Sequence, residues 1–258
     1  MLSRRNFLAT TALTAKAQTG FRWPNSKRLA VSLTWDDARV SQIDTGLKLL
    51  EDLQLKGTFY LSLPAMKKRV DGWKEMMRQG HEIGNHSTAH ACTGNYRFTR
   101  ALEDFTIEEM SKDIDNANQE IEATLGVKPR QFAYPCGQKF IGRGKTAQSY
   151  IPLIADKFDT GRGYLDEMPN YPQICDLSQL MGTHFDGIDF PAMKAILDKA
   201  SKDNRWVVFA GHEIGKSASQ TTDTEALKQL ADYLKDPAHG IWVDTVGRIG
   251  KYVTTNRA

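Results

Sequence analysis

Cysteine is scarce in this sequence. Three cysteines, Cys92, Cys136 and Cys175, occur among 258 residues, and none belongs to a C-x-x-C pair. This small, odd number argues against a disulfide framework, and it leaves one bridge with one free thiol as the alternative. Because a cysteine zinc site needs thiolates paired at short spacing, we expect no such site.

Several other patterns are also absent. The 34 basic and 31 acidic residues leave a formal net charge of +3, and no basic patch with interleaved aromatic residues occurs. We therefore expect no nucleic-acid partner. No G-x-G-x-x-G follows the first apolar run, and no G-x-S-x-G is present, which argues against dinucleotide binding and against a serine nucleophile. His81-Glu82 does not complete an H-E-x-x-H motif, so we interpret His81 as a structural histidine near the sheet.

The first 17 residues have the order of a secretory signal. Paired arginines, Arg4 and Arg5, precede a short apolar run at 7–15, and the small residues that follow fit a cleavage site before Gln18. The arginine pair predicts export by the twin-arginine route, to the periplasm or the cell exterior. A cytosolic tail that contains two arginines by chance is the alternative. The apolar run is too short to cross a bilayer, so we expect no stable membrane insertion.

The remaining chain alternates apolar runs with amphipathic helices. A helix is expected over 106–125, because Thr106 and Glu109 form a capping box and Gly126 follows the last apolar position. Such alternation predicts a parallel α/β sheet, either a barrel or a doubly wound sheet. The expected strands are 29–33, 57–61, 82–85, 131–134, 206–210 and 241–243.

Polar residues follow four of these strands, and this pattern favours the barrel. In a parallel barrel the carboxyl ends of all strands share one rim, so these residues should meet there. Two adjacent carboxylates are costly unless a cation compensates their charge, and two histidines four residues apart can bind one ion together with a carboxylate. The sequence thus predicts a catalytic metal site with an open position for water. The residues concerned are Asp36, Asp37, His86, His90, the segment 134–137 and His212.

These segments resemble the motifs of one known family. T-W-D-D at 34–37, G-H-E-I-G-N-H-S-T-A-H at 80–90, F-A-Y-P-C-G at 132–137 and a late strand followed by His212 are similar to the polysaccharide deacetylases, carbohydrate esterase family four. The resemblance covers about 28–253. It implies a single domain at 28–254 that folds as a distorted, incomplete (β/α) barrel, preceded by the signal at 1–17 and a lead-in at 18–27.

The resemblance also implies a role for each matching residue. One divalent metal ion, usually zinc in the family, would be bound by Asp37, His86 and His90. Asp36 would be the general base and His212 the general acid. The backbone N–H of Cys136 would stabilise the oxyanion, and Tyr134 and Pro135 would lie beside the substrate.

Two family features cannot be placed from the sequence. Phe132 stands where many members carry an arginine that pairs with the general base, so a partner for Asp36 is not identified. The fourth, aspartate-containing motif could include Asp166, Asp176 or Asp186.

The function implied by the resemblance is removal of N- or O-linked acetyl groups from a polysaccharide or oligosaccharide, with an acetylated glycan as partner. The glycan, the native metal and the oligomeric state stay open. One alternative is an allantoinase-like hydrolase of a small cyclic amide, against which the expected export argues. The other is a catalytically silent carbohydrate-binding relative, against which the full set of matching residues argues.

Overall fold

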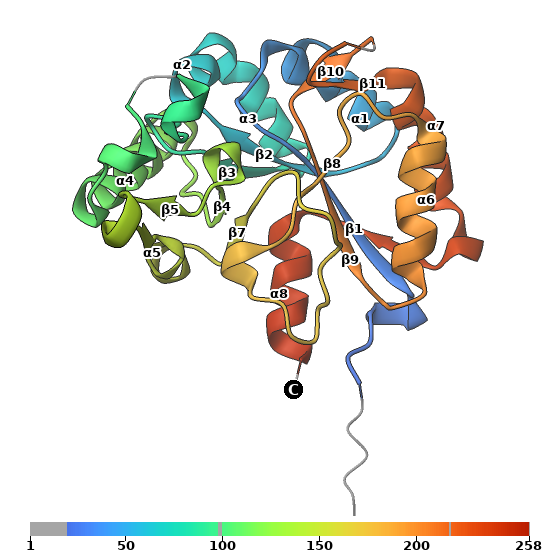
Figure 1. The fold of residues 1–258 in the computed structure, drawn as a ribbon. Helices are drawn as coiled ribbons and strands as arrows, with labels where there is room; N and C mark the ends of the chain where they lie inside the picture. The colour runs from blue at the N-terminus through green and yellow to red at the C-terminus, as the bar shows by residue number, and fades with distance from the viewer. Residues whose placement is uncertain (1–19, 98–99, 217, 258) are drawn as a thin grey trace, which may run out of the picture.

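One curved parallel sheet forms the centre of the computed structural model, which describes residues 20–97, 100–216 and 218–257 (Figure 1). Its strand order is β7-β4-β3-β2-β1-β9-β8, and β12 pairs with residues 29–31 of β1. The strands are β1 (Leu29–Trp35), β2 (Gly57–Leu61), β3 (Glu82–Asn85), β4 (Gln131–Ala133), β7 (Thr160–Arg162), β8 (Thr183–His184), β9 (Trp206–Gly211) and β12 (Ile241–Val243).

The sheet curls into an incomplete barrel, as the sequence predicted. In the described part of the chain, one isolated parallel bridge between Arg162 and Leu180 links the edge strand β7 to the segment just before β8. The backbone N–H of Gly163 donates to the carbonyl of Leu180 at 2.8 Å, and the N–H of Leu180 donates to Gly161 at 2.7 Å. Closure therefore depends on this short contact rather than on a full pair of strands.

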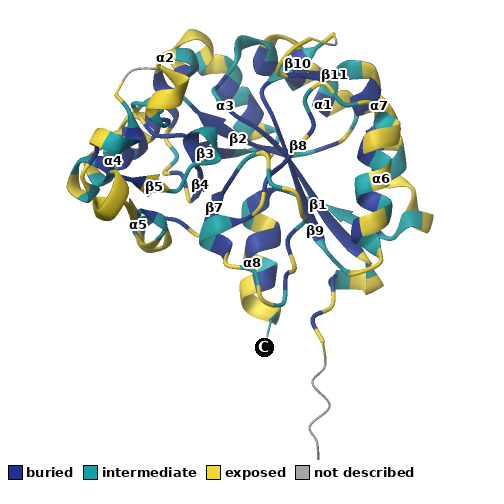
Figure 2. Cartoon of the chain, in the orientation of Figure 1, coloured by how far each residue is buried: buried dark blue, intermediate teal, exposed yellow. Residues whose placement is uncertain are grey.

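Helices cover the outside of the curved sheet. In Figure 1, α6 and α7 lie together on the right, α4 and α5 lie on the left, and α8 lies below the strands. Figure 2 shows that the strands are buried, whereas the helices bury one side and expose the other, as expected for a parallel sheet with crossover helices. The helices are α1 (Lys48–Asp52), α2 (Leu63–Met66), α3 (Val70–Arg78), α4 (Ile107–Leu125), α5 (Ile151–Lys157), α6 (Phe190–Ser201), α7 (Thr224–Lys235) and α8 (Val246–Asn256).

Helix α4 illustrates how local sequence determines an element. Thr106 accepts a hydrogen bond from the Glu109 N–H, and the Glu109 side chain accepts one from the Thr106 N–H, which completes the capping box. Residues at helical spacing, including Ile114 and Ile121, are buried against the sheet. The helix ends at Gly126, whose φ of 78° is accessible to glycine at little cost.

The structure contains two short ribbons beside the sheet and few exposed apolar groups. Antiparallel β5 (Phe140–Ile141) and β6 (Gln148–Ser149) form one ribbon, and parallel β10 (Glu213–Gly215) and β11 (Thr221–Asp223) form the other.

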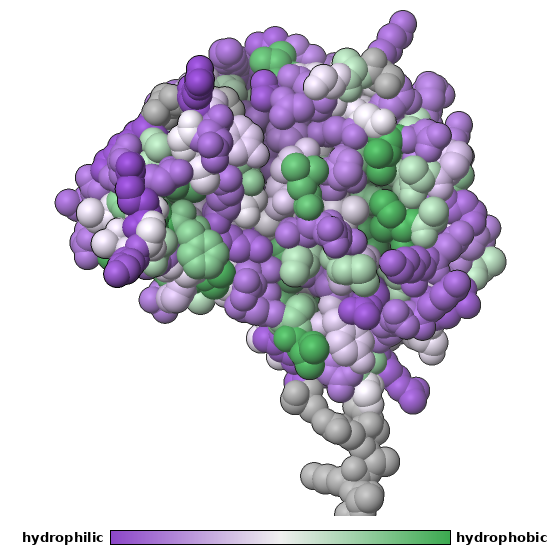
Figure 3. Space-filling view, in the orientation of Figure 1, coloured by the Kyte–Doolittle hydropathy of each residue, from purple (hydrophilic) through white to green (hydrophobic). Residues whose placement is uncertain are grey.

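The face seen in Figure 3 is mainly hydrophilic, with hydrophobic side chains in separate groups. Among the described residues, no helix is long and apolar enough to cross a membrane. The expected signal at 1–17 lies outside the described residues.

The three cysteines form one disulfide and leave one free thiol, which is the alternative that the sequence left open. Cys92 and Cys136 form a disulfide with a Cα–Cα distance of 5.9 Å, and Cys175 is free. The role expected for His81 is also found. Its Nδ1 accepts a hydrogen bond from the Gly57 N–H at 3.1 Å, and burial lowers the pKa of His81 to about 4.

A half-buried glutamate, Glu82, stabilises the start of α8 at the amino-terminal end of the barrel. Oε2 of Glu82 accepts hydrogen bonds from Thr58 Oγ1 at 2.8 Å and from the Gly247 N–H at 2.9 Å. The Val246 N–H donates to Thr58 Oγ1 at 3.0 Å. These strand side chains satisfy N–H groups that the helix itself leaves without partners. Burial raises the pKa of Glu82 from 4.5 to about 7 despite these hydrogen bonds.

This raised pKa predicts a pH-dependent stability. Glu82 binds its proton more tightly in the folded state than in the unfolded state. Its contribution to the free energy of unfolding is therefore fully present below pH 4.5 and is lost as pH rises through about 7. The variant Glu82→Gln keeps one oxygen as acceptor but cannot ionise. We therefore expect its unfolding temperature, relative to that of wild type, to be higher at pH 8 than at pH 5. Thermal unfolding at both pH values measures this difference. An equal difference at the two pH values would contradict the assignment.

Candidate active site

Side chains from the carboxyl ends of separate strands line one cavity of about 810 Å³. β1 is followed by Asp36 and Asp37, β3 by His86, β4 by the turn that contains Cys136, and β9 by His212. All of these residues and His90 line the cavity, so the rim predicted from the sequence is the rim that the fold builds. Short strands and left-handed turns direct these residues inward.

Asp37, His86 and His90 bring three donor atoms close together. Oδ1 of Asp37 lies 3.1 Å from Nε2 of His90 and 3.5 Å from Nε2 of His86, and the two Nε2 atoms are 3.2 Å apart. A tetrahedral transition-metal ion bound at about 2.0–2.2 Å by such ligands separates them by about 3.3 Å. The three residues therefore fit one divalent ion.

The environments of His86 and Asp37 also suit metal ligands. Nδ1 of His86 lies 2.9 Å from the Ala133 carbonyl, which orients the ring and directs Nε2 toward Asp37. Burial lowers the pKa of His86 to about 4, so its imidazole is neutral at neutral pH. Burial would raise the pKa of Asp37, but the hydrogen bond with His90 and nearby positive charges lower it well below its usual range. The neutral imidazole of His86 and the carboxylate of Asp37 thus face one point, which Nε2 of His90 also adjoins.

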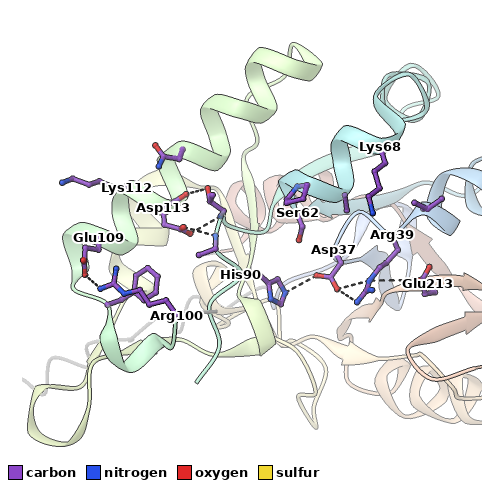
Figure 4. A pocket seen from close by; sticks show the side chains of 17 residues that line it. Asp37, Arg39, Ser62, Lys68, His90, Arg100, Glu109, Lys112, Asp113 and Glu213 are labelled. Atoms are coloured by element: carbon purple, nitrogen blue, oxygen red, sulfur yellow. Dashed lines mark hydrogen bonds and ion pairs between the residues drawn. The ribbon is translucent and has the colours of Figure 1, made fainter. Parts of the chain in front are cut away.

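Arg39 binds the opposite oxygen of the Asp37 carboxylate. Its Nη2 and Nε donate to Oδ2 at 2.8 and 3.2 Å, which leaves Oδ1 directed at the histidines. Nε of Arg39 also lies 4.0 Å from Glu213, the residue after His212. Figure 4 shows this row of His90, Asp37, Arg39 and Glu213 along the pocket. The arginine therefore restricts the rotation of the carboxylate.

Asp36 has a partner that the sequence did not reveal. Nη2 of Arg162 donates to Oδ1 of Asp36, and both side chains are almost completely buried. The guanidinium also lies 4.8 Å from the centre of the Tyr60 ring. Burial would lower the pKa of Arg162, but the charge of Asp36 outweighs this and raises it. The arginine that pairs with Asp36 is thus not at position 132, where this chain has Phe132. It lies thirty residues further along, on the edge strand β7.

Of the three aspartates that the sequence left as candidates for the fourth motif, Asp186 is the one that contacts His212. Oδ2 of Asp186 lies 2.7 Å from Nδ1 of His212, and Oδ1 accepts hydrogen bonds from the His212 N–H and from Thr222. Asp166 instead accepts from the Gly182 N–H, and Asp176 caps a short helical turn.

The hydrogen bond with Asp186 raises the pKa of His212. Burial alone would lower the pKa of His212, but the Asp186 hydrogen bond and nearby carboxylates raise it above its ordinary value. Trp35 supports the arrangement, because its indole N–H donates to the Thr222 hydroxyl at 3.2 Å. His212 is therefore oriented and kept protonated to higher pH.

A buried amide connects the segments that carry the two aspartates and His212. Nε2 of Gln42 donates to the Asp36 carbonyl at 2.6 Å and to the His212 carbonyl at 2.7 Å. Gln42 begins a π-helical segment, Gln42–Leu47, a rare geometry that often occurs at functional sites. No sequence motif indicated this residue, because an isolated glutamine carries no distinctive signal.

Two expected substrate contacts are corrected by the structure. Tyr134 and Pro135 are buried and do not line the cavity. The Tyr134 hydroxyl donates to the Ser178 carbonyl at 2.6 Å, so this side chain packs inside the fold instead. Tyr164 and Leu165, which follow β7, line the cavity in their place, and the Tyr164 ring lies 5.2 Å from His212. No sequence pattern indicated them, because the strand before them, β7, has only three residues.

A groove of about 950 Å³ adjoins the cavity and shares Asp37, Arg39, Ala89 and His90 with it. Figure 4 shows its walls, with Lys68 on one side and residues of α4 and the preceding segment, including Arg100, on the other. The cavity and the groove together provide an extended surface around the triad. The loop after His86 and His90 thus contributes to the lining as well as connecting β3 to α4.

Comparison with known proteins agrees with this geometry. Residues 23–148 match the family model described as polysaccharide deacetylase. The chain is 32% identical over 107 residues to the uncharacterized protein YlxY of Bacillus subtilis (strain 168), which covers 42% of this chain and 30% of that protein. It is 26% identical over 252 residues to a gellan lyase of a Bacillus species, covering 89% of this chain and 10% of that protein. The chain therefore spans less than a third of either relative.

Solved structures share the fold. A Mycobacterium smegmatis protein described as a candidate polysaccharide deacetylase has a TM-score of 0.70 and 14% identity, with 92% of this chain and 93% of that chain covered. A family 4 acetyl xylan esterase from Clostridium thermocellum, solved with a cobalt ion, has a TM-score of 0.57 and 18% identity, with 86% and 91% covered. A mutant of a family 4 pseudoenzyme with restored activity has a TM-score of 0.52 and 22% identity, with 90% and 70% covered.

These low identities establish the shared fold, and the family model adds the sequence match over the segment that contains Asp37, His86, His90 and Cys136. The fold alone does not establish activity, because it also occurs in a pseudoenzyme. Residues 23–148 thus match the polysaccharide deacetylase family, and the chain shares the fold of solved structures described as members of that family.

Proposed function

We propose that this protein is a metal-dependent deacetylase that hydrolyses N- or O-linked acetyl groups on a polysaccharide or oligosaccharide outside the cytoplasm. The observation that carries the proposal is the triad of Asp37, His86 and His90, which lines one cavity together with the buried carboxylate of Asp36 and the carboxylate-bound His212. A divalent ion held by the triad, for which zinc is the first choice, would supply Lewis-acid polarisation of the water and of the acyl carbonyl.

The roles of the protein side chains follow from their partners. Asp36, kept in an ion pair by Arg162, accepts the proton of the attacking water. The backbone N–H of Cys136 stabilises the oxyanion. His212, with its pKa raised by Asp186, donates a proton to the leaving amine or alcohol as the acyl bond breaks. Water thus adds across the bond, and acetate and a free amine or hydroxyl are released.

The size of the site supports a glycan rather than a small cyclic amide. The groove continues from the cavity along α4, so a chain of sugars can contact the protein on both sides of the acetylated residue. A small cyclic amide would fill only the cavity. The expected export signal, if cleaved near Gln18, would place this site with extracytoplasmic glycans.

Acetate release tests the proposed function directly. We expect the metal-loaded protein to release acetate from one or more of acetylated chitin oligomers, acetylated xylan and peptidoglycan, and to leave allantoin unchanged. Asp36→Asn should lower kcat by about a hundredfold to ten-thousandfold, as is typical when a general base is lost, while retaining the metal. The exposed Asp232→Asn on α7 is the matched control. Circular dichroism must show that each variant is folded, because Asp36 also pairs with buried Arg162. Wild-type rates in Asp36→Asn would contradict the assigned base.

Metal binding provides a separate test of the triad. Elemental analysis of the purified protein should show about one divalent ion per chain, and His86→Ala should lose it, because the remaining two ligands bind much more weakly. His184→Ala, which changes an exposed histidine at the end of β8, should keep the full content. Full metal occupancy in His86→Ala would refute this ligand set.

The Asp186–His212 contact predicts a change in pH dependence. In Asp186→Asn the raised pKa of His212 should fall, because burial then dominates. The general acid would lose its proton at lower pH, so the alkaline limb of the pH–rate profile should move to lower pH, with the largest effect on amide substrates. Asp176→Asn, which changes a helix cap away from His212, is the control. An unshifted alkaline limb in Asp186→Asn would rule out this role.

A further inference from the structure

A disulfide connects the two loops that carry opposite parts of the site. Cys92 lies two residues after His90, and Cys136 lines the cavity. The two cysteines are 44 positions apart in the sequence, and their Cα atoms lie 5.9 Å apart. Cys92 is buried, so the bridge forms part of the wall of the site rather than an external link.

The sheet itself holds these loops only weakly. β3 and β4 pair at a single position, Asn85 with Phe132. Beyond it the two segments no longer pair as strands, and the hydrogen bonds between them include that of His86 with Ala133 and one from the Thr93 N–H to Gln138 at 2.7 Å. The disulfide is therefore the covalent link that sets the distance between the metal-ligand loop and the 134–137 turn.

The turn also has a conformation that needs support. Cys136 has φ 54° and ψ 17°, a left-handed geometry that is uncommon for a residue with a side chain. Gly137 is left-handed too, and a Cβ at that position would lie 2.7 Å from the Tyr164 nitrogen. A residue in this geometry persists only where its surroundings enforce it, and the bridge acts at the residue whose N–H is proposed to stabilise the oxyanion.

We propose that the Cys92–Cys136 disulfide is a positioning element for catalysis: it holds the Cys136 N–H at a fixed place relative to His86 and His90, so that oxyanion and triad are aligned. This inference rests on the proposed deacetylase function. Cleavage of the bridge leaves the ligands and the groove in place but lets the turn move. The rate constant kcat therefore falls while KM and the metal content stay the same. Loss of an oxyanion donor costs about a hundredfold to a thousandfold, and a displaced donor costs about tenfold or more.

The same reasoning predicts that activity depends on redox conditions. A water-soluble phosphine cleaves the bridge: one water molecule supplies the oxygen of the phosphine oxide and the two protons of the new thiols, and the disulfide accepts the two electrons. A phosphine is preferred to a dithiol, which also binds divalent metals. Removal of the phosphine and exposure to oxidised glutathione re-forms the bridge by thiol–disulfide exchange and restores kcat.

The test compares Cys92→Ser, Cys136→Ser and the double variant with Cys175→Ser, which changes the free cysteine. The first three should show the same loss in kcat, about tenfold or more, with unchanged KM, and should not respond to phosphine. Wild type and Cys175→Ser should fall to the same level when treated with phosphine. His90 and the two sulfur atoms lie close enough to hold an ion together, so metal content is measured in every sample.

Three results distinguish the alternatives. A bridge that only stabilises the fold would lower the unfolding temperature yet leave kcat unchanged at 20 °C, which would overturn the proposal. A loss of kcat that follows a change in metal content would overturn it too. If wild type releases no acetate from any substrate, the proposed function fails instead. Hydrogen exchange of 134–138, measured against α7, then still reports whether the bridge holds the turn: faster exchange only in the bridge variants supports this, and equal exchange overturns it.

Discussion

The ion pair between Arg162 and Asp36 is the contact on which the shape of the site depends. Arg162 lies on the edge strand β7, and Asp36 follows the central strand β1, with β4, β3 and β2 between them in the sheet. The two side chains can meet only if the sheet curls so that its edge faces its centre. Removal of one partner leaves a buried charge without compensation, which costs about 3–5 kcal/mol, so barrel curvature and the charge of Asp36 are stabilised together.

A second consequence of this pair is that the two adjacent aspartates have different partners. Asp36 is held by a buried guanidinium, whereas Asp37 is turned the opposite way, toward His86 and His90, with Arg39 on its outer oxygen. Adjacent carboxylates on one strand end would otherwise repel each other and compete for the same cation. The structure separates them by giving each its own arginine. This separation suits the proposed roles, in which Asp36 accepts a proton and Asp37 binds the metal.

Much of the fold and site could be predicted from sequence because the signals were local or ordered along the chain. β1 and β9 are long, mainly apolar runs, and the capping box of α4 needs only Thr106 and Glu109. Parallel strands place their carboxyl ends on one rim. The common location of the polar residues after β1, β3, β4 and β9 therefore followed from the parallel direction of the strands. β7 and β8 were missed, since Thr-Gly-Arg and Thr-His have neither the length nor the apolar pattern of a strand.

The sequence by itself determined which residue types meet at the rim: two carboxylates, two histidines four apart and a late histidine. Tertiary structure decided their partners. Arg162, Asp186 and Gln42 each contact a residue that is far away in the sequence, so no local pattern indicates these contacts. Tyr134 was misassigned for the same reason, because the direction of a side chain after a strand depends on the turn that follows it. Spacing along a chain encodes periodicity, whereas a contact between an edge strand and a central strand is set only when the whole sheet closes.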